Sequence, residues 1–147
     1  MATRVRILLI EDSKFLRIAT ERALVRAGYV VRTASDGEQA LQIAQSEPLD
    51  LILLDMLLPK MSGHDVLKAL KKDAATANIP VVVLSGLSDK NAARLEADGA
   101  CAFLEKSSLA MDKDSTKLLT ALRTIITRLE HASSKHIGTS AEASAIR

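Results

Sequence analysis

The chain has 147 residues, with a hydrophobic content of 48% and a formal net charge of +2 at pH 7. That length suits one domain with a substantial core, and so small a charge does not predict binding to a nucleic-acid backbone. Aromatic residues make up only 2% of the sequence, which argues against modules that stack bases on aromatic side chains. We therefore expect no nucleic-acid partner.

The sequence contains one cysteine, Cys101, which can form neither an intramolecular disulfide nor a cysteine-based zinc site. Because it lies in the apolar run 100–104, we expect it to be a small core residue in a reducing compartment. No apolar run is as long as a membrane span, and the N-terminus shows no signal-peptide pattern. These features predict a cytoplasmic protein with no membrane partner.

Five short apolar runs, rich in branched side chains, have the length and the bounds of β-strands. The predicted strands are 5–10, 29–34, 50–55, 79–85 and 101–104. The third run is apolar almost throughout, which is typical of a strand buried on both faces of a sheet.

Segments with helical period separate these strands, and most of them have a recognisable cap. The caps are Ser13 and Gly28 for the first helix, the capping box 35–38 for the second, and Ser88 and Gly99 for the fourth. The third helix is predicted to begin with residues 63–65. A last helix carries an apolar stripe from Leu118 to Leu129. From Ala132 onward the sequence is small, polar and unpatterned, so we predict a domain over 1–131 and a disordered tail over 132–147.

Strands that alternate with helices predict right-handed crossovers and a parallel sheet with helices on both faces. Of the common doubly wound orders, the five-stranded flavodoxin-like order 2-1-3-4-5 fits the number of predicted strands. The predicted fold class is therefore α/β, a (βα)5 chain. Such sheets bind ligands beyond the carboxyl ends of their strands, where the strand order reverses.

Polar side chains stand at these strand ends. The first strand is followed by Glu11 and Asp12, the third ends in Asp55, the fourth ends in Ser85, and the fifth is followed by Lys106. Taken singly, each could be a helix cap, a turn residue or a solvated charge. Because all of them occur at strand ends of one sheet, we predict a single pocket that holds three acids, a hydroxyl and a cation.

Three neighbouring carboxylates repel one another unless a cation lies among them, and Mg²⁺ is the hard, oxygen-binding ion that suits them best. Lys106 offers a mobile positive charge to a phosphate, and Ser85 can donate a hydrogen bond to a phosphoryl oxygen. A carboxylate nucleophile, a metal, a cation and a hydroxyl donor are the parts of a phosphoryl-transfer site.

The chain resembles a response-regulator receiver domain of the two-component signalling family, of the single-domain chemotaxis type. The resemblance runs from about residue 4 to residue 129. It rests on the acidic pair 11–12, the loop 55–63 with its sequence DMLLPKMSG, the Ser-Gly step at 85–86, and Lys106.

The resemblance implies that Asp55 accepts a phosphoryl group from a phosphohistidine on a sensor histidine kinase or a histidine phosphotransfer protein. It also implies that Mg²⁺ is held by Asp12, Asp55 and the backbone carbonyl of Leu57, with Glu11 acting through water. Ser85 and Lys106 would then bind the phosphoryl oxygens.

The resemblance further assigns a switch to Ser85 and Phe103, which lies at the family's aromatic position three residues before the lysine. Two features depart from the family. Ser107 follows Lys106 where a proline with a cis bond is usual, and a cis bond without proline costs about 3 kcal/mol. Phe103 lacks the hydroxyl of the more usual tyrosine.

We expect a stand-alone receiver, because the sequence after the last predicted helix is too short for a helix-turn-helix output domain. Its face of helix 4, strand 5 and helix 5 would signal to a separate downstream protein or a dimer partner. A receiver-like interaction module that works without phosphorylation is the alternative. An enzyme fits less well, since the chain has no D-x-D after the first strand, no glycine-rich nucleotide loop and no histidine ligand set.

Leu57 and Leu87 resemble the family positions that flank the path of attacking water, and neither side chain can orient a water molecule. We therefore predict that the phosphorylated chain loses its phosphate slowly. Leu57→Asn should raise the first-order rate of phosphate loss, measured by intact mass after the phosphodonor is removed. An unchanged rate in Leu57→Asn would contradict this explanation.

Overall fold

The structure is a computed structural model that describes residues 4–56, 58, 60–85, 96–105 and 116–146. The side chains of residues 85, 105 and 133–146 are not part of this description. By its contacts the chain divides into a unit of residues 1–115 and a unit of residues 116–147, and each unit is described by itself below.

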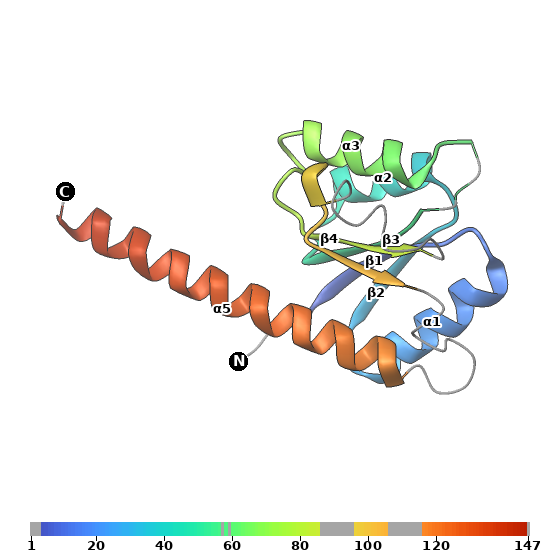
Figure 1. The fold of residues 1–147 in the computed structure, drawn as a ribbon, viewed down its shortest axis with the longest axis horizontal. Helices are drawn as coiled ribbons and strands as arrows, with labels where there is room; N and C mark the ends of the chain where they lie inside the picture. The colour runs from blue at the N-terminus through green and yellow to red at the C-terminus, as the bar shows by residue number, and fades with distance from the viewer. Residues whose placement is uncertain (1–3, 57, 59, 86–95, 106–115, 147) are drawn as a thin grey trace. The chain divides into compact units, whose positions relative to one another are not determined.

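The first unit contains a five-stranded parallel sheet whose order is β2-β1-β3-β4-β5 (Figure 1). The strands are β1 Arg6–Ile10, β2 Val30–Ala34, β3 Leu51–Asp55, β4 Val81–Ser85 and β5 Ala102–Glu105. The doubly wound α/β fold and the 2-1-3-4-5 order predicted from the sequence are confirmed.

Within the described part of this unit, three helices cover the sheet, with α2 and α3 on one face and α1 on the other (Figure 1). They are α1 Lys14–Arg26, α2 Gly37–Ser46 and α3 Gly63–Lys72. Most of the fourth predicted helix falls on residues 86–95, which lie outside the described part of the chain.

One hydrophobic core cluster lies between the sheet and the α2 and α3 layer. It contains inward-facing side chains of β1, β3 and β4 together with three residues of α3, all buried: Leu8, Ile10, Ile52, Leu54, Val81, Val83, Val66, Leu67 and Leu70. Burial of one such aliphatic side chain contributes about 1.5–3 kcal/mol relative to an exposed position. This core fixes the level at which β1 and β3 end, and so the position of the acids that follow.

The predicted cap of the first helix is confirmed, because the Ser13 hydroxyl accepts a hydrogen bond from the Leu16 N–H at 3.3 Å. The predicted capping box at 35–38 is wrong by one residue. Asp36 is the cap of α2, and its carboxylate accepts from the Gln39 N–H at 2.8 Å, while the Gln39 amide oxygen accepts from the Ser35 N–H at 2.8 Å. The sequence contains both the Ser-x-x-Glu pattern at 35–38 and the Asp-x-x-Gln pattern at 36–39. The helix uses the second pattern, in which the Asp36 carboxylate is a good hydrogen-bond acceptor.

The expectation that Cys101 is a core residue is wrong, because its side chain is exposed. Cys101 immediately precedes β5, which is an edge strand of the sheet. Its backbone N–H joins the sheet by donating to the carbonyl of Val81 at 2.9 Å. The apolar run that contains it is therefore only half covered, as is common for an edge strand.

The second unit is the helix α5, which extends over Thr116–Ile146, and Leu118 and Leu122 of its predicted stripe are buried. The backbone is helical where the sequence predicts a disordered tail from Ala132. This segment contains no proline and one glycine, Gly138, so no strong helix breaker opposes the helix. The domain bounds 1–131 stay a prediction. None of the described helices combines the length and the apolar character needed to cross a membrane.

Candidate acidic site at the carboxyl edge of the sheet

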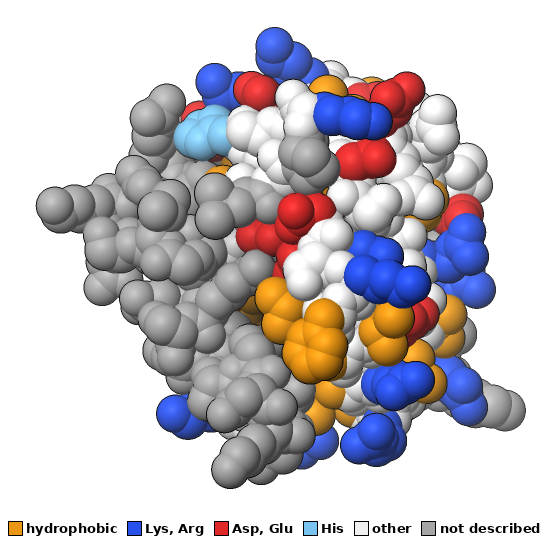
Figure 2. Space-filling view, turned by 90° about the vertical axis from the view of Figure 1, so that its right-hand side faces the viewer, with side chains coloured by type: hydrophobic (Ala, Val, Ile, Leu, Met, Phe, Trp, Pro, Cys, Tyr) orange, Lys and Arg blue, Asp and Glu red, His pale blue; other side chains and the backbone are white. Residues whose placement is uncertain are grey.

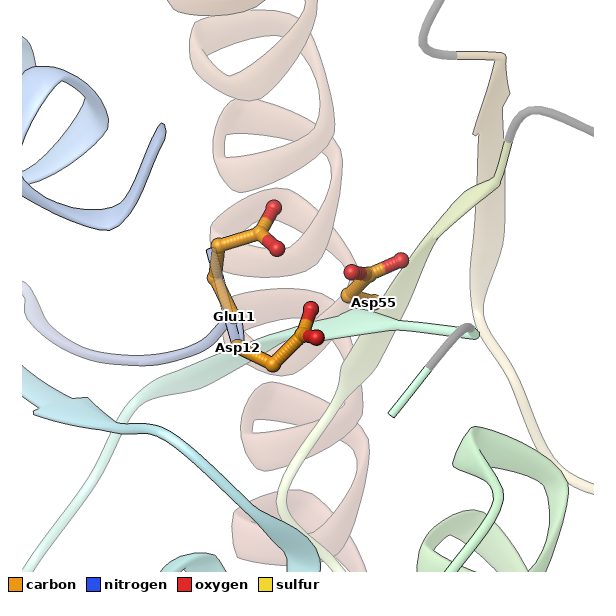
Figure 3. Close-up of side chains that lie close together, drawn as sticks. All are labelled: Glu11, Asp12 and Asp55. Carbon is orange, nitrogen blue, oxygen red and sulfur yellow. The ribbon is translucent and has the colours of Figure 1, made fainter. Parts of the chain in front are cut away.

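Three carboxylates meet at the carboxyl ends of β1 and β3 (Figure 3). Glu11 and Asp12 follow β1, Asp55 is the last residue of β3, and each offers a carboxylate oxygen within 4.8 Å of the other two. Glu11 is 4% exposed and Asp55 is 2% exposed, whereas Asp12 is open to solvent. The structure thus brings the three acids together, as their places at the strand ends predict.

The backbone on both sides of the acidic pair holds Glu11 and Asp12 in place. The Glu11 N–H donates to the Ala34 carbonyl at 3.0 Å, which extends the pairing of β1 with β2 by one residue. The Ser13 N–H donates to the Glu11 carboxylate at 3.2 Å. From α1, the Arg17 guanidinium donates to the carbonyls of Glu11 at 3.0 Å and Asp12 at 3.3 Å. The turn between β1 and α1 is therefore cross-linked rather than loose.

Asp55 is held by the strand beside it and by the start of α3. The N–H of the next residue, Met56, donates to the Leu84 carbonyl of β4 at 3.1 Å, and the Gly63 N–H donates to the Met56 carbonyl at 3.1 Å. A Cβ on Gly63 would lie 2.6 Å from the Asp55 carbonyl oxygen and 2.6 Å from the Met56 Cα. The first turn of α3 can approach the Asp55 backbone this closely because residue 63 has no side chain.

The chemistry of this donor set fits Mg²⁺. Carboxylates this close repel one another, and the repulsion is strongest where burial lowers the local dielectric. A hard divalent ion takes oxygen ligands, keeps some of its water and is commonly bound by only one or two carboxylates. One exposed and two buried acids could supply such ligands while leaving a side open to solvent. Glu11 and Asp55 each interact with other groups of the protein in the structure.

The remaining predicted site residues are described only in part. Ser85 ends β4 opposite Glu105 of β5, one residue beyond the Leu84 that pairs with Asp55, so its backbone lies at the same edge. The Ser85 side chain lies outside the described part of the structure. The same holds for all atoms of Leu57, Leu87 and Lys106, and for the Lys106–Ser107 bond. Phe103 lies in β5 and packs, half-buried, against the core on the α2 and α3 side.

Reasoning from the sequence missed a surface feature of α1. Phe15 counts among the apolar residues that give α1 its helical period, yet its side chain is 80% exposed, and the helix buries Thr20 and Leu24 instead. Phe15 lies in the first turn of α1, three residues after Asp12. Figure 2 shows this edge of the molecule, where acidic side chains are bordered by hydrophobic and basic ones. The sequence signal that could have predicted this exposure is the position of Phe15 two residues after the Ser13 cap, in the first turn of the helix.

Residues 7–123 match the family profile of the response regulator receiver domain. Among curated proteins, the chain is 43% identical over 113 residues to a gliding motility regulatory protein of Myxococcus xanthus. The matched region is 76% of this chain and 14% of that protein. It is 38% identical over 85 residues to the alkaline phosphatase synthesis transcriptional regulatory protein PhoP of Bacillus subtilis. That matched region is 58% of this chain and 35% of the regulator. The chain thus spans well under half the length of these relatives.

Solved structures give the same family. The chemotaxis response regulator CheY4 of Vibrio cholerae has a TM-score of 0.75 and 30% sequence identity, over 84% of this chain and 99% of that one. The signal receiver domain of a LuxO repressor protein from Vibrio parahaemolyticus has a TM-score of 0.76 and 29% identity, over 89% of this chain and 96% of that one.

The close approach at Gly63 generates a stability prediction. Gly63→Ala should lower the free energy of unfolding by about 1–3 kcal/mol, because the added methyl group meets backbone atoms that cannot rotate away. Gly37→Ala is the matched control, since Gly37 also opens a helix and its added Cβ would meet only the side chains of Val66 and Met61. Urea unfolding should show the smaller loss in Gly37→Ala. Equal losses would contradict the argument.

Proposed function

Since the chain belongs to the response regulator receiver family, whose members are signalling domains of two-component systems, we propose that it accepts a phosphoryl group on Asp55 from a phosphohistidine donor. The observation that carries the proposal is the meeting of Asp55 with Glu11 and Asp12 at one strand edge. In the transfer, an Asp55 carboxylate oxygen forms a bond to phosphorus while the bond between phosphorus and the donor's ring nitrogen breaks. That nitrogen keeps the electron pair and takes up a proton.

The acidic pocket would hold Mg²⁺ through Asp12, Asp55 and the backbone carbonyl of Leu57, with Glu11 acting through water. A bound Mg²⁺ supplies positive charge opposite the phosphoryl oxygens. Ser85 would donate a hydrogen bond to one of these oxygens, and Lys106 would pair its ammonium with another. The near-complete burial of Asp55 supports the nucleophile assignment, because little water reaches that carboxylate from the core side.

Output would follow from a population shift. Ser85 would move toward the phosphoryl group, and Phe103, already half-buried against the core, would fill the space it leaves. The changed surface would bind a separate downstream protein or a dimer partner. This role is signalling rather than catalysis of a reaction on a free substrate, with only slow loss of the chain's own phosphate.

We propose a stand-alone receiver, the arrangement of the CheY4 chain, which is matched over 99% of its length. The match to small parts of longer transcriptional regulators makes a receiver within a larger protein the competing arrangement. A module that works without phosphorylation is the second candidate, favoured by Ser107 in the place of the usual proline. A cytoplasmic location is part of the proposal, because a single cysteine suits a reducing compartment.

The phosphohistidine donor would be a sensor histidine kinase or a histidine phosphotransfer protein, and it must cover the surface around Asp55 to deliver its phosphoryl group. The first turn of α1 belongs to that surface, and it presents Phe15 together with the exposed Lys14. Farther along the same helix, Arg22 and Arg26 are exposed as well. An exposed aromatic side chain with basic neighbours suits a donor surface of apolar and acidic side chains.

Incubation with Mg²⁺ and acetyl phosphate should add one phosphoryl group to the chain, read by intact mass. Asp55→Asn should lose the added mass, because an amide is not a nucleophile for this transfer, while Asp50→Asn should keep it as the matched control. Omission of Mg²⁺ should also abolish the gain. A folded wild-type chain that gains no mass would favour the phosphorylation-independent module.

Phe15→Ala should slow phosphotransfer from a phosphorylated histidine phosphotransfer protein about tenfold or more, as loss of an aromatic anchor typically does. Its phosphorylation by acetyl phosphate should be unchanged, because that donor needs no docking surface. Val25→Ala is the control, since Val25 is 54% exposed on the same helix but ten residues farther along. Equal rates in Phe15→Ala and wild type would contradict docking at this turn.

A further inference from the structure

α3 is attached at two points to the short segment 98–101 that leads into β5. Near its N-terminus, the His64 Nε2 lies 2.5 Å from an oxygen of Asp98, and both side chains are about three-quarters buried, with 24% and 26% of their surface exposed. Near the C-terminus of α3, the aliphatic part of Lys71 packs on Gly99, where an added Cβ would lie 2.7 Å from the Lys71 Cγ. His64 is therefore a contact residue between α3 and this segment.

The C-terminal attachment is fixed. The Lys71 ammonium donates to the carbonyl of Ala77 at 3.1 Å and to that of Ile79 at 2.8 Å, just before β4. Burial lowers the pKa of this ammonium, and the nearby Cys101 opposes part of that effect. Lys71 thus ties the end of α3 both to the start of β4 and to Gly99.

The N-terminal attachment reaches the phosphoacceptor itself. Gly63 bonds the Met56 carbonyl and leaves no room for a side chain beside the Asp55 backbone, and His64 is the next residue. Between the two attachments, Val66, Leu67 and Leu70 of α3 share the core with Ala100. Because close-packed interiors deform little, a displacement of the Asp55 loop must move the first turn of α3 with it.

We propose that the His64–Asp98 contact couples the Asp55 loop to the start of β5, so that phosphorylation of Asp55 is transmitted through the first turn of α3 to the segment that carries Phe103. This inference rests on the proposed function, and it makes His64 and Asp98 positioning residues. The two-state element is the contact itself, which is kept or broken as the α3 turn moves. A pair that is buried to this extent is screened little by salt and so gives a sharp preference for one arrangement.

The chain contains its own reporter for this coupling. Cys101 is its only cysteine, is exposed, and lies three residues after Asp98. Burial on its inner side raises the pKa of the thiol, and nearby Lys71 partly offsets that rise, so its reaction with a maleimide should be slow enough to time. The rate of that reaction reports on the surroundings of segment 98–101.

The test compares the Cys101 reaction rate before and after phosphorylation by acetyl phosphate, with intact mass counting the phosphate. In the wild type and in the control Lys68→Gln, phosphorylation should change the rate at least threefold. In His64→Ala and in Asp98→Ala, phosphate should be gained normally but the rate change should be lost. The double variant should behave like either single variant, because all three remove one contact.

A full rate change in phosphorylated His64→Ala would overturn the coupling, and so would a phosphorylated wild type with an unchanged rate. If no phosphate is gained, the proposed function fails separately. The coupling is then decided by the resting proteins, in which His64→Ala must still alter the Cys101 rate relative to Lys68→Gln. Equal resting rates would overturn it.

Discussion

Two nearly buried carboxylates, Glu11 and Asp55, lie at the edge of an aliphatic sheet with a third acid beside them, and most features of the structure serve to hold them there. Acids in such a position repel one another and lose hydration, so the arrangement opposes folding rather than driving it. The stabilisation comes from elsewhere. β3 is buried along its whole length and β1 from Ile7 onward, and the core they share with α3 sets where each strand ends.

The structure holds the acids through the backbone. β1 continues into Glu11 through a bond to β2, Arg17 binds the carbonyls of both acids of the pair, and β4 pairs with Met56 just after Asp55. Gly63 then brings α3 against the Asp55 backbone. Such preorganisation suits the proposed role of Asp55, because a preformed site can accept a phosphoryl group with little rearrangement. It also means that a change at Asp55 is felt by α3, which is the basis of the coupling proposed through His64.

The sequence was enough to predict the fold and the acidic cluster, because both follow from local patterns. Alternation of apolar runs with helical segments defines the parallel sheet, and parallel strands place Glu11, Asp12 and Asp55 at one edge. What it could not predict depends on contacts between distant segments. The His64–Asp98 pair joins residues 34 positions apart, and the exposure of Phe15 and Cys101 depends on which face of a helix and which edge of the sheet are covered.

The central claim is that Asp55 is the residue that carries the phosphate. Reduction of the phosphorylated chain with borohydride converts an aspartyl phosphate to homoserine, and peptide mass spectrometry then locates the altered residue. We expect homoserine at position 55 and unmodified aspartate at position 12, since the proposal assigns Asp12 to Mg²⁺ and not to the phosphate. Homoserine at position 12, or a phosphate that resists reduction and maps to a hydroxyl side chain, would contradict it.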